Sequence, residues 1–240
     1  MSRSLRLNAT ELNVLAALLG MRIAPLSDSR TTRADALESL VRRRIVDANA
    51  KRVSTQVATL LAVLARPRHR IEITPHSSTP FVIAVQTLTH VVHESTGDLD
   101  VITPVNDGIS AMLSAIDSGI GVAFSLPGHT WHDMVAQARF ANDGQLARMA
   151  QLDGCDDDGA ATAAHLAKHY RLRHDARILT FRGKGRWRGS ELSWIAAPGG
   201  AWVLDDGGRF GTDSDLVRRR ATFSPIRPSD ALRIAIQTTN

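Results

Sequence analysis

The chain has 240 residues and a mass of 26.0 kDa, and 43% of its residues are hydrophobic. A chain of this size buries about 70% of its unfolded surface, so a full core needs neither a metal nor disulfides. Its single cysteine, Cys155, excludes an internal disulfide and favours a reducing compartment, so we expect the protein in the cytoplasm. No run of about 18 apolar residues occurs, and we therefore expect no insertion into a membrane.

The formal net charge of +5 and the pI near 10.3 raise the question of a nucleic-acid partner. Only three of the 29 basic residues are lysines, and the arginines are scattered apart from short runs at 42–44 and 218–220. A dedicated nucleic-acid surface usually concentrates its charge on one face. We therefore interpret most basic residues as solvated surface and do not expect a nucleic-acid partner.

Three helices are predicted in the first part of the chain. The first lies near Ala9–Leu19, and the third, which starts near Ser54, is apolar nearly all round and is therefore predicted to be buried. Local signals set the boundaries: a capping box of Asn8 with Glu11, an N-cap at Thr32 and a stop at Pro67.

The pattern then changes to alternating and β-branched residues, which indicate strands. Four strands are predicted, at Arg70–Thr74, Phe81–Leu88, Thr89–Glu94 and Leu99–Val105. A helix resumes after Pro104, so this half of the chain ends as it began, with helical structure.

The second half repeats this order. A helix from about Asp158 to Arg171 precedes the strands, and a helix at Pro228–Gln237 follows them. The four strands are predicted at Arg177–Arg182, Glu191–Ala196, Ala201–Leu204 and Leu216–Ser224. Two helix–four strand–helix units predict a mixed α/β fold with pseudo-twofold symmetry, in which each half buries its sheet against the other.

The repeat also predicts how the domain is organised. We expect a single domain over residues 1–240, with halves at about 1–122 and 123–240. The stretch Gly119–Trp131 is rich in Gly, Ser and Pro and is the expected linker between the halves.

No combination of residues predicts catalysis or a metal centre. His165 and His169 have the i, i+4 spacing of zinc ligands on a helix, but the glutamate that a metalloprotease helix needs is missing beside them. Cys155 precedes three aspartates, whose charges raise a thiol pKa and oppose activation. The sequence also lacks a nucleophile elbow and a phosphate-binding loop. We therefore expect no catalytic residues, no metal and no cofactor.

The most unusual segment is Gly183–Gly189, which reads Gly-Lys-Gly-Arg-Trp-Arg-Gly. One interpretation is a cationic and aromatic contact loop for protein or nucleic acid, with Arg186, Trp187 and Arg188 making the contacts. The other is a long hairpin tip whose glycines serve the turn. Both interpretations remain open from the sequence, although a tryptophan on a loop is hard to explain without a contact.

A winged-helix nucleic-acid-binding regulator is the alternative function. The second and third helices followed by strands, with the arginine run at 42–44, have the order that such a unit requires. A recognition helix carries basic and polar residues that read bases, whereas the third helix is apolar nearly all round.

The chain resembles the EspG family of type VII (ESX) secretion-associated chaperones over nearly its full length. Several motifs in their order carry the resemblance: Leu12–Leu15, Arg44–Asp47, Arg52-Val53, Leu64–Pro67, Leu126-Pro127, Ser193-Trp194 and Asp205–Phe210, with Pro228 before a terminal helix. The resemblance implies a central, largely antiparallel sheet with two helical bundles. It also implies a cytosolic, non-catalytic chaperone that binds the apolar helical tip of a PE–PPE-type heterodimer, keeps the pair soluble and hands it to the secretion system, with the secretion ATPase machinery as a further partner.

Two departures from the family pattern concern its partner-binding region. The connection between the second and third strands is short, near Thr87–Thr89, and the loop of the second half is rich in Trp and Arg. The predicted partner-binding residues are Arg186, Trp187, Arg188, Leu192, Trp194 and Phe210. In this prediction client helices dock against Leu192 and Trp194, which share one face of a strand, and Trp187 closes over them.

Overall fold

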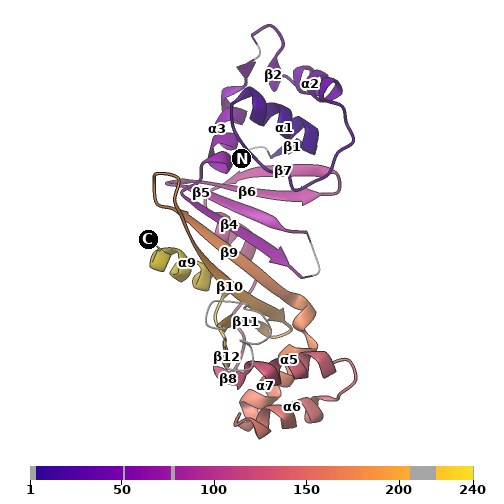
Figure 1. The fold of residues 1–240 in the computed structure, drawn as a ribbon, viewed down its shortest axis with the longest axis vertical. Coiled ribbons are helices and arrows are strands. Elements are labelled where there is room, and N and C mark those ends of the chain that lie inside the picture. Colours follow the sequence, from indigo (N-terminus) through magenta and orange to yellow (C-terminus); the bar gives the residue numbers. More distant parts are fainter. Residues whose placement is uncertain (1–3, 51, 77–78, 206–219, 240) are drawn as a thin grey trace. The chain divides into compact units, whose positions relative to one another are not determined.

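A computed structural model describes residues 4–50, 52–76, 79–205 and 220–239, and shows a mixed α+β fold (Figure 1). The first half contains β1 (Leu5–Leu7), α1 (Ala9–Leu18), α2 (Arg33–Arg42), β2 (Val46–Asp47), β3 (Arg52–Val53), α3 (Thr55–Ala65), β4 (His69–Pro75), β5 (Phe81–Gln86), β6 (Thr89–Thr96), β7 (Leu99–Val105) and α4 (Gly108–Leu113). The second half contains β8 (Phe124–Pro127), α5 (Gly128–Gln137), α6 (Asp143–Leu152), α7 (Asp157–Lys168), a short 3₁₀ turn (Tyr170–Leu172), β9 (Arg173–Phe181), β10 (Trp187–Ala197), β11 (Gly200–Asp205), β12 (Arg220–Ser224) and α9 (Pro228–Thr239).

Among the described residues, ten strands are hydrogen-bonded neighbours in the order β1-β7-β6-β5-β4-β9-β10-β11-β12-β8. In the first half the leading strand β1 pairs antiparallel with the last strand β7, and in the second half β8 pairs antiparallel with β12. The order within the first half, β1-β7-β6-β5-β4, is therefore that of β8-β12-β11-β10-β9 in the second. The predicted repeat of four strands is present, and each half adds one further strand of this sheet at its start, β1 or β8.

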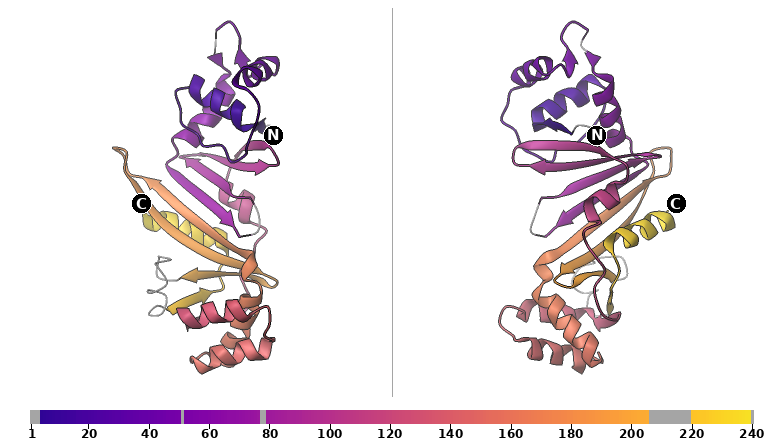
Figure 2. Two further views of the ribbon diagram at one scale, coloured as in Figure 1. Left: turned by 45° about the vertical axis from the view of Figure 1, so that its right-hand side comes forward. Right: turned by 180° about the vertical axis from the view of Figure 1, so that it is seen from behind.

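The chain divides into two compact units that interleave along the sequence. The first consists of Met1–Ile73, Thr79–Ala111 and Leu179–Arg188, and the second of Thr74–Ser78, Met112–Ile178 and Gly189–Asn240. The tip of the β9–β10 hairpin therefore packs with the first unit, although it belongs to the second half of the sequence. Figure 2 shows this tip projecting past the neighbouring strands of its unit. The division into sequence halves near residue 122 stays a prediction.

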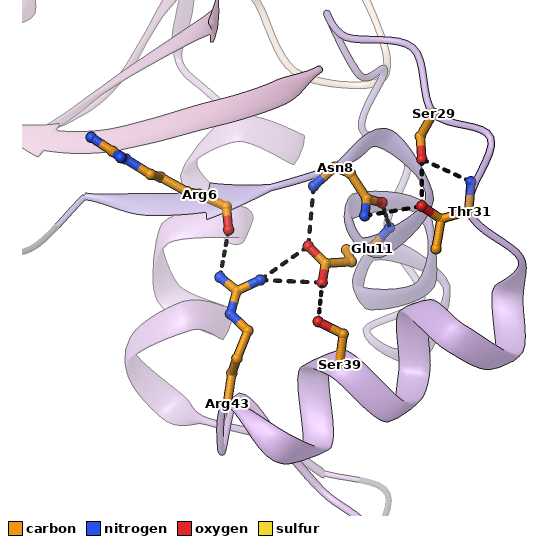
Figure 3. Close-up of polar contacts among 7 residues, drawn as sticks. All are labelled: Arg6, Asn8, Glu11, Ser29, Thr31, Ser39 and Arg43. Atoms are coloured by element: carbon orange, nitrogen blue, oxygen red, sulfur yellow. Dashed lines mark hydrogen bonds and ion pairs between the residues drawn. The ribbon is translucent and has the colours of Figure 1, made fainter. Parts of the chain in front are cut away.

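A charged cluster joins α1 and α2 in the first unit (Figure 3). Asn8 and Glu11 form the predicted capping box, and the Glu11 carboxylate is only 3% exposed. Arg43 Nη1 donates to both Glu11 oxygens at 3.2 and 3.0 Å, and Ser39 Oγ donates to Oε1 at 2.7 Å. Arg43 also donates to the Arg6 carbonyl oxygen. A buried carboxylate costs little when it is paired in this way, so the cluster fixes how β1, α1 and α2 meet.

A second buried carboxylate ties the loop after α1 to strands β6 and β7. Asp100 is fully buried, and its Oδ1 lies 2.6 Å from His93 Nε2. Asp100 also accepts hydrogen bonds from the Leu26 N–H at 2.7 Å and from Ser27 Oγ at 2.5 Å. Burial alone raises the pKa of this carboxyl, but the bonds from His93, Ser27 and Leu26 outweigh that and lower it.

Each unit has its own apolar core. In the first, buried residues of α1 and α3, including Leu12 and Leu61, pack against strand residues such as Ile102. In the second, Trp131 and Leu146 of α5 and α6 pack with apolar residues of α7 and of the strands. The rings of Phe124 and Phe223 stack there, with centroids 4.8 Å apart.

Several sequence-based expectations need correction. The expected linker Gly119–Trp131 contains strand β8 and the start of α5, because Phe124 and Leu126 alternate into the core. Helices α5 and α6 were not predicted at all. The second predicted helix, α2, is only partly buried, since Leu40 is fully buried but Leu37 is 41% exposed.

Candidate partner-binding surface

The tip of the β9–β10 hairpin is a tight, glycine-dependent turn. The Arg182 N–H donates to the Arg186 carbonyl at 2.9 Å, and the Arg186 N–H donates to the Gly183 carbonyl at 3.0 Å. Gly183, Lys184 and Gly185 have φ of 81, 51 and 72°, in the left-handed region that glycine adopts without strain. The glycines therefore serve the turn, as one of the two sequence interpretations proposed.

Trp187 lies at the start of β10 and contacts Phe181 at the end of β9. The ring centroids are 5.2 Å apart and the planes are tilted by 55°, which is a favourable cross-strand aromatic contact. Even so, Phe181 is 42% exposed and Trp187 is 45% exposed. The other tryptophans, Trp131, Trp194 and Trp202, are 7%, 0% and 3% exposed. Trp187 is thus the one indole that can contact a partner without a rearrangement of the core.

Two other segments of the first unit lie beside this tip. The Phe181 N–H donates to the Arg68 carbonyl at 2.9 Å, and the Arg68 N–H donates to the Val85 carbonyl at 2.8 Å. Val85 leads into the turn between β5 and β6, where Leu88 is 89% exposed. Thr87 of that turn has a φ of 46°, a strained value for a β-branched residue, and this conformation holds Leu88 outward.

We call residues 66–68, 87–88 and 181–188 together the basic sheet end. Its exposed basic residues are Arg66, Arg68, Arg182, Lys184, Arg186 and Arg188, and these three segments contain no Asp or Glu. The same three segments also carry the exposed apolar side chains of Leu88, Phe181 and Trp187. The surface therefore combines exposed apolar groups with a uniformly positive rim.

The positive charges of this surface act on the neighbouring buried residue His69. It is buried, and its Nδ1 lies 3.1 Å from Thr180 Oγ1. Its pKa is lowered first by burial and then by the positive charges of Arg68 and Arg182. The same field favours a negatively charged group brought up from solvent.

The structure separates the residues that were predicted to act together. Trp194 is fully buried, and its ring stacks on His174 with centroids 5.2 Å apart, so no client helix can dock directly on it. Leu192 is half-buried. Trp187 stands an odd number of residues before both, and alternate strand residues face opposite sides, so it does not close over them. Phe210 lies outside the described residues.

The two histidines considered above as zinc ligands contact backbone carbonyl groups. His165 Nε2 lies 3.0 Å from the Pro198 carbonyl oxygen, and His169 Nδ1 lies 2.9 Å from that of His165. Within the described part of the chain, no group of three or more His, Cys, Asp or Glu side chains is placed to hold a metal ion. Burial, and then the charge of Asp156, raise the pKa of the Cys155 thiol.

In the described part of the chain, no helix is both long enough and apolar enough to cross a membrane.

Sequence reasoning singled out Arg186, Trp187 and Arg188 but missed the other contributors, Leu88 among them. Phe181 falls inside the predicted strand Arg177–Arg182 and was not identified as exposed. The aromatic pair of Phe181 and Trp187 could have been found, because a hairpin across 183–185 puts these residues opposite each other. The contribution of Leu88 depends on long-range strand pairing that no local signal shows.

Comparison with known proteins identifies the fold. The sequence model of the EspG family matches residues 6–230. The chain is similar to the Mycobacterium tuberculosis type VII secretion system chaperone EspG5, solved in complex with the PE25–PPE41 dimer. The two chains share 18% sequence identity with a TM-score of 0.66, over 99% of this chain and 95% of that chain. A search of curated proteins found no match.

Proposed function

The chain belongs to the EspG family, and from this premise we propose that it is a type VII secretion chaperone. In this proposal it binds the apolar helical tip of a PE–PPE-type heterodimer in the cytoplasm, keeps the pair soluble and hands it to the secretion machinery. The family match over residues 6–230 carries the proposal. The fold shared with EspG5, a chaperone solved with a PE–PPE dimer, supports it.

We further propose that the basic sheet end takes part in client binding. Interfaces combine a few aromatic or arginine anchors with a polar rim. Trp187, flanked by Arg186 and Arg188, has this composition and is accessible without unfolding. Trp194 is withdrawn from the predicted set because it belongs to the core, and Leu192 remains as a half-buried residue on the other side of β10.

We propose a binding role without catalysis. The polar clusters in the described residues are accounted for by structure: Glu11 and Asp100 are buried and fully paired, and the histidines at 165 and 169 contact backbone carbonyls. No observation favours the winged-helix alternative, because α3 packs its apolar residues into the core of the first unit.

Co-expression with a PE–PPE pair tests the function. We expect a tagged chain to co-purify with the pair as a complex of one chain per heterodimer, measured by size-exclusion chromatography with light scattering. The pair should be more soluble with the chain than without it. A chain that leaves every tested PE–PPE pair unbound, while binding duplex DNA in a salt-dependent way, would contradict the proposal and favour the regulator.

A further inference from the structure

The basic sheet end carries several positive charges that no acidic side chain of the described residues neutralises. Arg66, Arg68, Lys184, Arg186 and Arg188 are all exposed, and none forms an ion pair with another residue in the described part of the chain. Some cations elsewhere do have acidic partners, as with Arg43 and Glu11 or Arg173 and Asp175. Like charges that are close together repel, so this cluster does not stabilise the folded chain.

The exposed apolar side chains of the same surface favour a protein partner over a nucleic acid. Leu88 is 89% exposed at a strained turn, and Phe181 and Trp187 are about half exposed on the neighbouring hairpin segment of the same surface. Aromatic rings alone would also suit stacked bases, but an aliphatic leucine held outward at a turn gives no stacking surface. Exposed leucine, phenylalanine and tryptophan side chains suit the apolar face of a protein helix.

We propose that the basic sheet end selects clients by charge. It accepts PE–PPE-type pairs whose helical tip carries carboxylates beside its apolar residues, and it rejects pairs whose tip is basic. Carboxylates on the client meet the exposed guanidinium groups and Lys184, while Leu88 and Trp187 contact its apolar side chains. A basic tip would bring like charges together, which is a common way in which interfaces exclude wrong partners. This inference rests on the proposed chaperone function and names the class of client.

Two synthetic amphipathic helical peptides provide a defined probe. They have equal length and the same leucine and phenylalanine stripe, and they differ only in carrying either four glutamates or four lysines beside it. Each is titrated into the full chain at low and high salt, with single-stranded RNA as a third ligand. We expect the glutamate peptide to bind about tenfold or more tightly than the lysine peptide at low salt, with the difference shrinking as salt is raised.

Charge reversal on the chain supplies the matched test. The variant Lys184→Glu/Arg186→Glu/Arg188→Glu should lose the preference for the glutamate peptide. The control Arg33→Glu/Arg139→Glu/Arg148→Glu changes net charge equally at exposed positions outside the surface and should keep the preference. Circular dichroism checks that both variants are folded.

The possible outcomes are distinct. Equal binding of both peptides, or binding of neither, contradicts charge selection. Tighter binding of RNA than of the glutamate peptide contradicts it as well and assigns the surface to nucleic acid. If a PE–PPE pair binds the wild-type chain and the Lys184→Glu/Arg186→Glu/Arg188→Glu variant equally well, charge selection fails while the chaperone function stands. If no pair binds the wild-type chain, the chaperone function itself fails.

Discussion

The first unit uses charge in two opposite ways. Around α1, Arg43 is paired with the buried Glu11, whose carboxylate also accepts from Ser39 and from the Asn8 N–H. At the basic sheet end, Arg186 and Arg188 are exposed and have no such acid among the described residues. A paired, buried charge fixes the arrangement of secondary structure elements, whereas an unpaired, exposed one stays available for a partner. Mutations should therefore separate the two regions into stability and binding.

Asp100 should give the largest effect on stability. Asp100→Ala leaves the His93 imidazole and the Leu26 N–H buried without their acceptor. We expect a loss of about 3–5 kcal/mol in the free energy of unfolding, measured by urea denaturation. The matched control Asp98→Ala removes an exposed carboxylate from the neighbouring turn and should change stability by about 0.5 kcal/mol or less. Similar values for both variants would show that the buried cluster does not hold the fold.

Substitution of Glu11 should give the second-largest loss of stability. Glu11→Ala removes the acceptor of Arg43, Ser39 and the Asn8 N–H, but Arg43 is 36% exposed and can return to water. We expect a loss of about 2–3 kcal/mol in stability, smaller than at Asp100 for this reason. Client affinity of the folded fraction should stay unchanged. A loss of affinity without a loss of stability would contradict the assignment of this cluster to the fold.

Trp187 should show the opposite behaviour. Trp187→Ala removes an exposed indole whose described ring contact is with Phe181, so stability should fall by only about 0.5–1 kcal/mol. Affinity for a PE–PPE pair should fall by about thirtyfold, or about 2 kcal/mol, in isothermal titration calorimetry. Phe140→Ala is the control, since that ring is 89% exposed outside the basic sheet end and should leave affinity unchanged. Equal affinity of the Trp187 variant and wild type would remove this residue from the client site.

The pH dependence of stability should show a smaller effect. The folded pKa of Asp100 lies below its ordinary value of 3.8, so its contribution is fully present above that value and is lost as the pH falls through the folded pKa. As the pH falls below 3.8, the wild-type chain should therefore lose stability more steeply than Asp100→Asn, which has no carboxyl at this position. Parallel curves from thermal unfolding at several pH values would contradict this.

Much of the fold could be predicted from local signals. The capping box at Asn8, the N-cap at Thr32 and the alternation of β5 to β7 all act within a few residues. Helix α5 was missed because it begins at Gly128 after a proline, with no capping side chain. Helix α6 did carry a signal, since Asn142 and Gln145 form a capping box that sequence reasoning overlooked.

The candidate site was less predictable because it is assembled by pairing between distant strands. Trp187 stood out by composition alone, but its burial relative to Trp194 depends on which residues cover each face of β10. Leu88 and Arg68 reach the site only because β4 lies between β5 and β9 in the sheet. Local sequence patterns contain no such information.

The central claim, that a PE–PPE-type client binds at the basic sheet end, can be tested at Trp187 directly. Labelling the chain with 5-fluorotryptophan gives one ¹⁹F resonance for each of its four tryptophans, and Trp187→Phe assigns the one of interest. When an unlabelled PE–PPE pair is added, we expect the Trp187 resonance to shift. Its chemical shift should also stop changing when H₂O is replaced by D₂O, because the partner then covers the indole. The resonances of the buried Trp131, Trp194 and Trp202 should move little. A pair that forms a stable complex while the Trp187 resonance stays unchanged would contradict the account.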